Sequence, residues 1–305
     1  MMNIAALSGA LELGLLYSLV AFGVHLSFRV LNFPDLTVDG SFPLRGAVAA
    51  TLIVGGMNPW RATLCAISAG MLAGLCTAGL NVQFKVISLL ASILTMIGLY
   101  SVNLRIMGQP NLSLLNQVTV ISTLEPWLSQ IPSSLKPFGI TIVLTVMIAT
   151  ILGLLNLFFA TQLGLALRAT GANPGMARAQ GIDTDHLIVL GMTISNGLVA
   201  LAGALFVQIN GFADVQMGMG TIVFGLVAVI VGESLVTSRR LIWITTSAII
   251  GSILYRILVA VALNADFLGL QAQDLNLITS VLVSLALNLP QSYWVRKLRR
   301  LTKYD

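Results

Sequence analysis

The sequence predicts an all-α protein: a polytopic bundle of transmembrane helices in which some helices are short or broken. Of its 305 residues, 57% are hydrophobic and only 9% are charged, whereas soluble domains are ~25% charged. The mean hydropathy is +0.94. Long apolar runs recur along the whole chain, each close to the ~20 residues that a membrane-spanning helix needs. We therefore expect residues 1–305 to form one transmembrane domain.

About nine apolar segments are expected to build the bundle. The first carries Glu12 and has no basic start, so it predicts a retained span rather than a signal peptide. Segments 41–54 and 222–236 are short for a crossing, because 14 helical residues extend only ~21 Å and the hydrocarbon core is ~30 Å thick. The segments are 4–28, 41–54, 62–82, 86–104, 139–160, 187–208, 222–236, 241–261 and 275–293.

The basic residues predict the orientation. Eleven of the 16 Lys and Arg residues fall on the side of the C-terminus and three on the other side, while Arg45 and Arg256 lie within apolar segments. Cytoplasmic loops carry the excess of basic residues, so we expect the tail 296–305 in the cytoplasm and the N-terminus outside. The basic tail then anchors the protein rather than binding nucleic acid. The insert 105–138 falls outside, as either a docking surface for an external partner or a simple loop.

Several residues within the apolar segments suggest packing roles. Gly70 and Gly74 form a G-x-x-x-G pair, which lets two helices approach closely. Glu12 either faces a pore or pairs with Arg256. Arg45 is expected near the inner end of its segment, where its long side chain can extend to the membrane surface.

The inside loop 163–186 cannot span lipid, because it contains two Arg, two Asp, one His, one Pro and four Gly. Its middle predicts a short helix. Asn173 is a good N-cap, Pro174 suits the first helical position and Gly181 suits the stop. By spacing alone, this short capped helix is either a docking element or an ordinary connector.

Residues 32–43 combine two prolines and two aspartates in front of a short apolar segment. Part of this stretch should lie at membrane depth as non-helical backbone, with Pro34 and Pro43 ending or starting helices. Asp35 and Asp39 either cap the freed backbone N–H groups or line a path, and both readings are compatible. Asp39 is the better candidate for a cap and Asp35 for a path-facing role.

A short echo suggests an internal repeat. Residues 33–38 read FPDLTV and residues 212–217 read FADVQM, which share a Phe-x-Asp start. The predicted topology places the two motifs at opposite ends of the membrane, as an inverted repeat would.

Three motifs resemble one family. QLGLALRATGANPGMARAQGI (162–182) is similar to the cytoplasmic coupling loop of ABC importer permeases of the branched-chain amino acid and ribose class. DLTVDGSFPLRGAVAA (35–50) resembles the same class, most closely its tryptophan/tyrosine-type permeases. LVAVIVGESLV (226–236) is similar to a third family motif, with Glu233 in place of a glycine. The resemblance covers about residues 5–290.

The resemblance implies a permease with a type II-like fold in the cytoplasmic (inner) membrane of a bacterium. In that family the short loop helix sits in a groove of the ATPase subunit. The residues implied to couple to the ATPase are Arg168, Gly171, Asn173, Pro174, Met176, Ala177, Arg178 and Gly181. The candidates for the translocation path are Asn32, Asp35, Asp39 and Glu233.

The expected function is the permease subunit of an ABC importer, not an enzyme. The chain has no G-x-x-x-x-G-K-[ST] motif, so ATP–Mg should bind to a separate ATPase. No catalytic or metal-site spacing is evident, and we expect no cofactor in this chain. The implied partners are an ABC ATPase dimer, an extracytoplasmic solute-binding protein, a second permease copy and membrane lipid, but no nucleic acid. The implied substrate is a small solute, an aromatic or branched-chain amino acid.

Two other functions fit a helical membrane protein. An ion-gradient-driven secondary transporter would need a charge relay deep in several spans and no ATPase, and the loop 163–186 argues against it. A non-transporting scaffold subunit would not need broken spans at matching depths.

Overall fold

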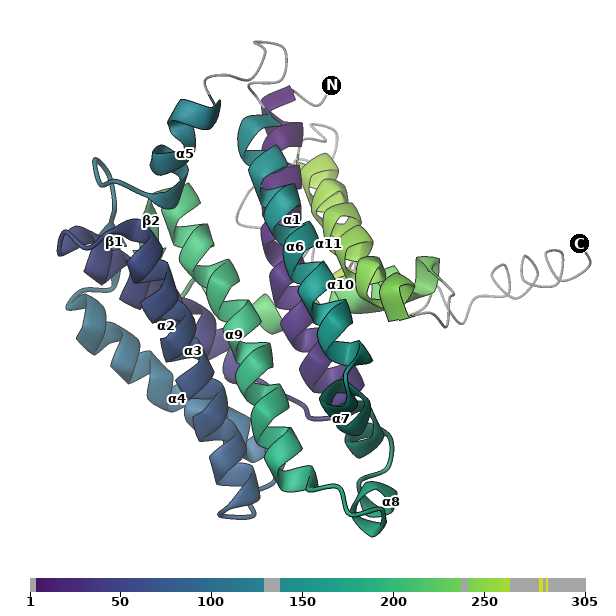
Figure 1. Ribbon diagram of the computed structural model, residues 1–305. Helices are drawn as coiled ribbons and strands as arrows, with labels where there is room; N and C mark the ends of the chain where they lie inside the picture. The colour runs from purple at the N-terminus through teal and green to yellow at the C-terminus, as the bar shows by residue number, and fades with distance from the viewer. Residues whose placement is uncertain (1–3, 129–137, 237–240, 264–279, 282–283, 285–305) are drawn as a thin grey trace, which may run out of the picture.

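The computed structural model describes residues 4–128, 138–236, 241–263, 280–281 and 284 (Figure 1). The elements in chain order are α1 (Ile4–Val24), the π-helix η1 (His25–Val30), α2 (Thr37–Val54), α3 (Pro59–Val82), α4 (Ser88–Met107), β1 (Asn111–Ser113), α5 (Val120–Leu128), α6 (Gly139–Ala160), α7 (Gln162–Ala172), α8 (Pro174–Ala179), α9 (Thr184–Asn210), β2 (Phe212–Asp214), α10 (Thr221–Leu235) and α11 (Leu241–Leu263).

Six helices of the described part are long and apolar enough to cross a membrane. They are Leu7–Val30, Pro59–Val82, Ser88–Met107, Gly139–Ala160, Thr184–Asn210 and Thr245–Ala262. The chain is thus a multi-pass helical membrane protein. The first eight predicted apolar segments all coincide with helices, while 275–293 lies almost entirely outside the described residues. Helix α10 is apolar but shorter, and α2, at 18 residues, is also short.

Local sequence sets the ends of these helices. Helix α3 begins at Pro59, and the Asn58 side chain accepts a hydrogen bond from the Trp60 N–H group (3.0 Å). Helix α4 stops at Gly108, whose φ is +67°, and α9 stops at Gly211, whose φ is +77°. A left-handed residue at this position suits glycine, because glycine has no Cβ to clash.

The two long helices α1 and α9 form the centre of the bundle. Helix α1 packs against α9, α10 and α11, and α9 packs against α1, α2 and α3. The predicted close approach at the G-x-x-x-G pair is confirmed, because a Cβ on Gly74 would lie 2.4 Å from the Met192 carbonyl oxygen of α9. Figure 1 shows α7 and α8 at one end of the bundle, called here the α8 end, and the N-terminus at the other.

The break between α1 and α2 lies alongside the interior of α9. Residues 31–36 are non-helical, and a Cβ on Gly191 of α9 would meet the Leu31 side chain at 2.4 Å. Asp35 accepts a hydrogen bond from Asn196 of α9. Asn196 lies ~18 Å along the helix axis from the first residue of α9, at a rise of ~1.5 Å per residue. The break therefore lies deep in the bundle, and it is shorter than the predicted stretch 32–43.

The prediction that Pro43 ends or starts a helix is wrong, because Pro43 lies inside α2. Proline has no N–H group, so the carbonyl oxygen of Asp39, four residues earlier, loses its helical donor. The backbone of Gly218 packs onto this site. A Cβ on Gly218 would lie 2.1 Å from the Asp39 oxygen, so only glycine allows this approach.

The two Phe-x-Asp motifs have matching local structures. The Asp35 carboxylate accepts from the Thr37 N–H group (2.9 Å), and the Asp214 carboxylate accepts from the Gln216 N–H group (2.6 Å). Each turn precedes a short helix, α2 or α10. Helix α1, which precedes the first motif, packs on α10, which follows the second motif. In the same way, α9, which precedes the second motif, packs on α2, which follows the first. This exchange is the pattern expected of an inverted repeat.

Two three-residue strands were not predicted. β1 and β2 pair antiparallel, with Asn111 opposite Asp214 and Ser113 opposite Phe212. Figure 1 shows them at the end away from α8, next to α5. They tie the insert after α4 to the turn before α10.

Candidate functional site

Helix α8 is built as the sequence predicted. The Asn173 side chain accepts a hydrogen bond from the Met176 N–H group (3.0 Å), and Pro174 occupies the first turn. Gly181 adopts a φ of +82° after the last turn, where the Ile182 N–H group bonds the Ala177 carbonyl oxygen (3.1 Å). The structure adds a second helix that was not predicted: α7 precedes α8 and begins at the capping residue Thr161.

The two faces of α8 differ in exposure. The Met176 side chain is 60% exposed, whereas Ala177 is 3% exposed and faces the rest of the protein. Gly175 and Ala172 are exposed as well. The exposed surface of α8 therefore carries one large apolar side chain, Met176, and the Arg178 side chain, which is also 60% exposed.

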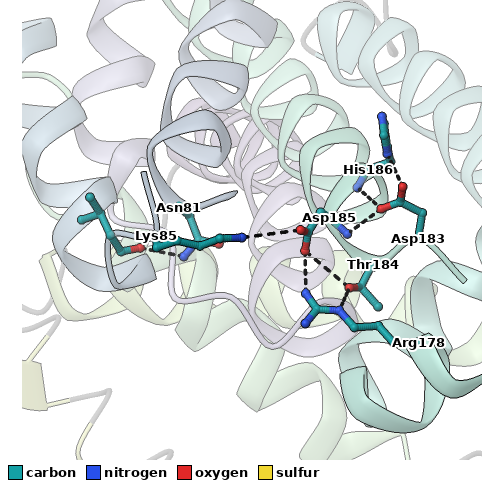
Figure 2. A network of polar contacts seen from close by, with 8 residues as sticks. Asn81, Lys85, Arg178, Asp183, Thr184, Asp185 and His186 are labelled. Atoms are coloured by element: carbon teal, nitrogen blue, oxygen red, sulfur yellow. Dashed lines mark hydrogen bonds and ion pairs between the residues drawn. The ribbon is translucent and has the colours of Figure 1, made fainter. Parts of the chain in front are cut away.

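Arg178 points back toward its own protein (Figure 2). Its Nε donates to Thr184 Oγ1 (2.6 Å), and its Nη2 donates to Asp185 Oδ1 (2.6 Å). Asp185 also forms an ion pair with Lys85 Nζ at 3.7 Å. Asp185 thus connects α8 with the start of α9 and with the loop between α3 and α4.

The neighbouring residues stiffen this junction. Asn81 Nδ2 donates to the Val86 carbonyl oxygen (2.8 Å) and orders the α3–α4 loop (Figure 2). Asp183 caps α9 by accepting from the His186 and Asp185 N–H groups. The His186 N–H bond, together with the His186 side chain, lowers the pKa of Asp183 below its usual value.

A cavity of about 620 Å³, called here the Arg168 cavity, lies at the α8 end. It is lined by residues predicted for ATPase coupling and by residues predicted for the translocation path. Asn32 and Glu233, predicted for the path, line it beside Arg168 and Gly171, predicted for coupling. Glu233 forms an ion pair with Arg29 of η1. A Cβ on Gly171 would lie 1.8 Å from the Val30 carbonyl oxygen, so α7 approaches η1 as closely as backbones can.

A buried polar network holds α2 against α3 and α9. Asn196 Oδ1 accepts from Arg45 Nη2 and Ser41 Oγ (both 2.9 Å), and Asn196 Nδ2 donates to Asp35 Oδ2 (2.8 Å). Thr37 and Thr77 share a hydrogen bond of 2.7 Å between their hydroxyl groups. The expectation that Arg45 extends to the membrane surface is wrong, because its side chain is fully buried.

Asp35 therefore occupies a capping position within this network. It has no solvent-exposed surface, and its carboxylate oxygens face Thr37 and Asn196. This geometry matches the cap reading of the two aspartates rather than the wall of a path. Sequence reasoning missed Asn196, whose only signal is a lone amide within an apolar segment.

Asp39 caps a distant helix and borders a second cavity. Its carboxylate accepts from the Ile222 N–H group (2.8 Å) and the Gly220 N–H group (3.3 Å) at the start of α10. The adjoining space of about 540 Å³, the Asp39 cavity, lies between α2, α4 and residues 215–220. Its walls are Asp39, Gly40, Pro43, Met96, Ile97, Tyr100, Ser101, Asn103, Val215, Met219 and Gly220.

Glu12 and Arg256 do not pair. Glu12 accepts from Thr141 Oγ1 at 3.5 Å, while the Arg256 guanidinium lies 4.0 Å from the centre of the Tyr17 ring. A cation over an aromatic face is stabilised without an acid. In the described part of the chain, no three His, Cys, Asp or Glu side chains gather as a metal site would require.

Spanning helices, a non-helical break inside the bundle and a small exposed helix at one end fit a transport permease. The comparisons agree. Residues 6–288 match the family described as the branched-chain amino acid transport system / permease component, and the chain belongs to this family. It is a permease subunit of the ABC-importer type.

Individual relatives cover most of the chain. The tyrosine transport system permease protein of Clostridioides difficile is 38% identical over 269 residues, 88% of this chain and 86% of that protein. An uncharacterized protein of Rickettsia prowazekii is 34% identical over 286 residues, 92% of this chain and 95% of that protein. The probable branched-chain amino acid transport permease protein LivH of Methanocaldococcus jannaschii is 29% identical over 215 residues, 65% of this chain and 64% of that protein. No solved structure matches the chain.

Proposed function

We propose that this permease subunit moves an amino acid across the cytoplasmic membrane by alternating access, as a pair of copies driven by two ATPase subunits. The α8 end faces the cytoplasm, and a solute-binding protein delivers substrate at the opposite end. An amino acid substrate is supported by the names of two relatives, a tyrosine transport permease and a probable branched-chain amino acid transport permease. The nine-span, type II-like arrangement with an external N-terminus is part of this proposal.

The observation that carries the proposal is the contrast between the two sides of α8. Ala177 packs against the rest of the protein, and Met176 is the one large apolar side chain that α8 leaves exposed. Methionine adapts its shape to an apolar groove, and it is common at binding surfaces. We place the ATPase groove on this face. Arg178 is also 60% exposed, and its bonds to Thr184 and Asp185 hold α8 in position.

The same contacts supply a route for the ATPase motion. Pulling α8 moves Arg178, which bonds Asp185, and Asp185 pairs with Lys85 at the start of the α3–α4 loop. Helix α4 begins directly after that loop and forms one wall of the Asp39 cavity. A shift at the ATPase therefore reaches the cavity through one chain of polar contacts.

The Asp39 cavity is the proposed path. Gly40 packs against Met96 near the middle of α4, which is itself long enough to span the membrane. Asp39 is only half-buried at this depth. A carboxylate facing lipid would cost about 2.5–3.5 kcal/mol on insertion scales, so the exposed face of α4 beside it should meet water or the second copy.

The test exchanges single methionines for glutamate and measures association with the ATPase encoded beside this permease. Met176→Glu should keep the protein in the membrane but abolish copurification and ATP-driven uptake, because a charge enters an apolar groove. Met57→Glu, which changes an exposed methionine outside α8 (38%), should leave copurification with the ATPase unchanged. Ala177→Glu should instead lower folded yield, because the new charge would be buried. If Met176→Glu copurified and transported like the wild type, the docking assignment would be wrong.

A further inference from the structure

The polar groups that line the Asp39 cavity are the Asp39 carboxylate, the Asn103 amide and the hydroxyl groups of Tyr100 and Ser101. Asp39 presents a carboxylate whose oxygens accept from α10 but have further lone pairs. Asn103 is 1% exposed and lines the cavity; its Nδ2 donates to the Gly40 carbonyl oxygen (3.2 Å). Among the described residues its Oδ1 has no hydrogen-bond partner. A buried acceptor without a donor is costly, so Asn103 Oδ1 would gain from a ligand that supplies a donor.

No basic side chain among the described lining residues could neutralise an anion. The N–H groups at the start of α10, which would otherwise attract a carboxylate, are already occupied by Asp39. An acidic ligand group would therefore meet the like charge of Asp39, with the Tyr100 and Ser101 hydroxyl groups as neutral donors. A protonated amine has three donors and no acceptor, and it complements Asp39 and Asn103 in both charge and hydrogen bonding.

The remaining walls suit an apolar body. Met96, Met219, Tyr100 and Pro43 provide flexible sulfur-containing and ring surfaces. The cavity volume of about 540 Å³ is within the usual range for small-molecule sites. Aromatic rings pack well against methionine sulfur and tyrosine.

We propose that the Asp39 cavity is a binding site for a primary ammonium group carried on an apolar or aromatic body, with Asp39 and Asn103 Oδ1 as its acceptors. This rests on the proposed function, and it predicts that an apolar amino acid is recognised by its amino end, with its carboxylate directed away from Asp39. The charge of Asp39 disfavours solutes that carry only an acidic group. Asp39 then has two roles, since its carboxylate caps α10 and binds the substrate.

The experiment measures protection of a cysteine placed in the cavity, without the solute-binding protein. Ser101→Cys is introduced into a Cys65→Ala, Cys76→Ala background, and the permease–ATPase complex is reconstituted in nanodiscs. A neutral methanethiosulfonate labels Ser101→Cys in the presence of phenylalanine, phenethylamine or 3-phenylpropionate. The first two carry the ammonium group and the third does not. Phenylalanine and phenethylamine should slow labelling, and 3-phenylpropionate should not.

Variants assign the effect to the two acceptors. Asp39→Asn should weaken protection by phenethylamine roughly tenfold or more, as expected from loss of a charge-assisted hydrogen bond. Asn103→Leu should also weaken protection by phenethylamine. This variant keeps the Asp39 cap of α10, so it still tests the site if Asp39→Asn folds poorly. Asp214→Asn, the same exchange outside the cavity, should have no effect.

Equal protection by 3-phenylpropionate, no protection by either amine, or full protection in both variants would overturn the ammonium site. None of these results bears on whether the ATPase binds α8, which the Met176→Glu measurement decides separately. Loss of ATPase association with intact amine protection would overturn the proposed docking and leave the cavity site in place.

Discussion

Replacing Asn196 with alanine should be among the most damaging single changes in the described bundle. Its amide forms hydrogen bonds with three buried side chains: Asp35, Arg45 and Ser41. Alanine would leave a carboxylate and a guanidinium without this shared partner in the centre of α2, α3 and α9. Arg45 already has two nitrogens without hydrogen-bond partners among the described residues, so it has no evident replacement.

The magnitude follows from the lost bonds. Hydrogen bonds to charged groups contribute about 1.5–3 kcal/mol each, and two are lost, which gives roughly 3–6 kcal/mol. The cavity left by the amide increases the loss. Asn210→Ala is the matched control in the same helix: its exposed amide makes one bond, to the Phe206 carbonyl oxygen (2.8 Å), which should contribute about 0.5–1.5 kcal/mol.

The assay is thermal unfolding of the detergent-solubilised proteins, followed by fluorescence-detected size-exclusion chromatography. Large domains shift by about 2–4 °C per kcal/mol, so Asn196→Ala should lower the apparent Tm by on the order of 10 °C or fail to accumulate in folded form. If Asn196→Ala unfolded at the same temperature as Asn210→Ala, the buried network would not stabilise the bundle as described.

Two further predictions concern helix packing and coupling. Gly74→Ile should destabilise the protein by at least about 1–3 kcal/mol through overpacking, since a Cβ at Gly74 would lie 2.4 Å from the backbone of α9. The control Gly79→Ile should unfold near the wild-type temperature, because a Cβ at Gly79 meets nothing within 4 Å. Equal Tm values for the two variants would contradict the contact. Asp185→Asn should barely change Tm, because exposed ion pairs contribute about 0.2–1 kcal/mol, but it should lower uptake per ATP hydrolysed by disconnecting Arg178 from Lys85. An unchanged ratio of uptake to ATP hydrolysis would show that the motion takes another route.

The sequence by itself determined the features that depend on neighbours along the chain. Apolar length predicted eight of the helices, because spanning a membrane needs a continuous run of apolar residues. The Asn173, Pro174 and Gly181 pattern predicted α8, since capping and stop signals act within a few residues. The G-x-x-x-G pair predicted a close contact, although not that its partner is α9.

The tertiary structure alone decided the partners of the polar side chains. Asn196 lies 151 residues from Arg45, and Ile222 lies 183 residues from the Asp39 carboxylate that caps it. Arg178 stays exposed on α8, but only the folded structure shows that it bonds Asp185 of α9. Likewise Arg45 is buried rather than extended to the surface. A lone polar residue in an apolar run shows that a partner is needed, because burial without one is costly, but which partner meets it depends on how distant helices pack.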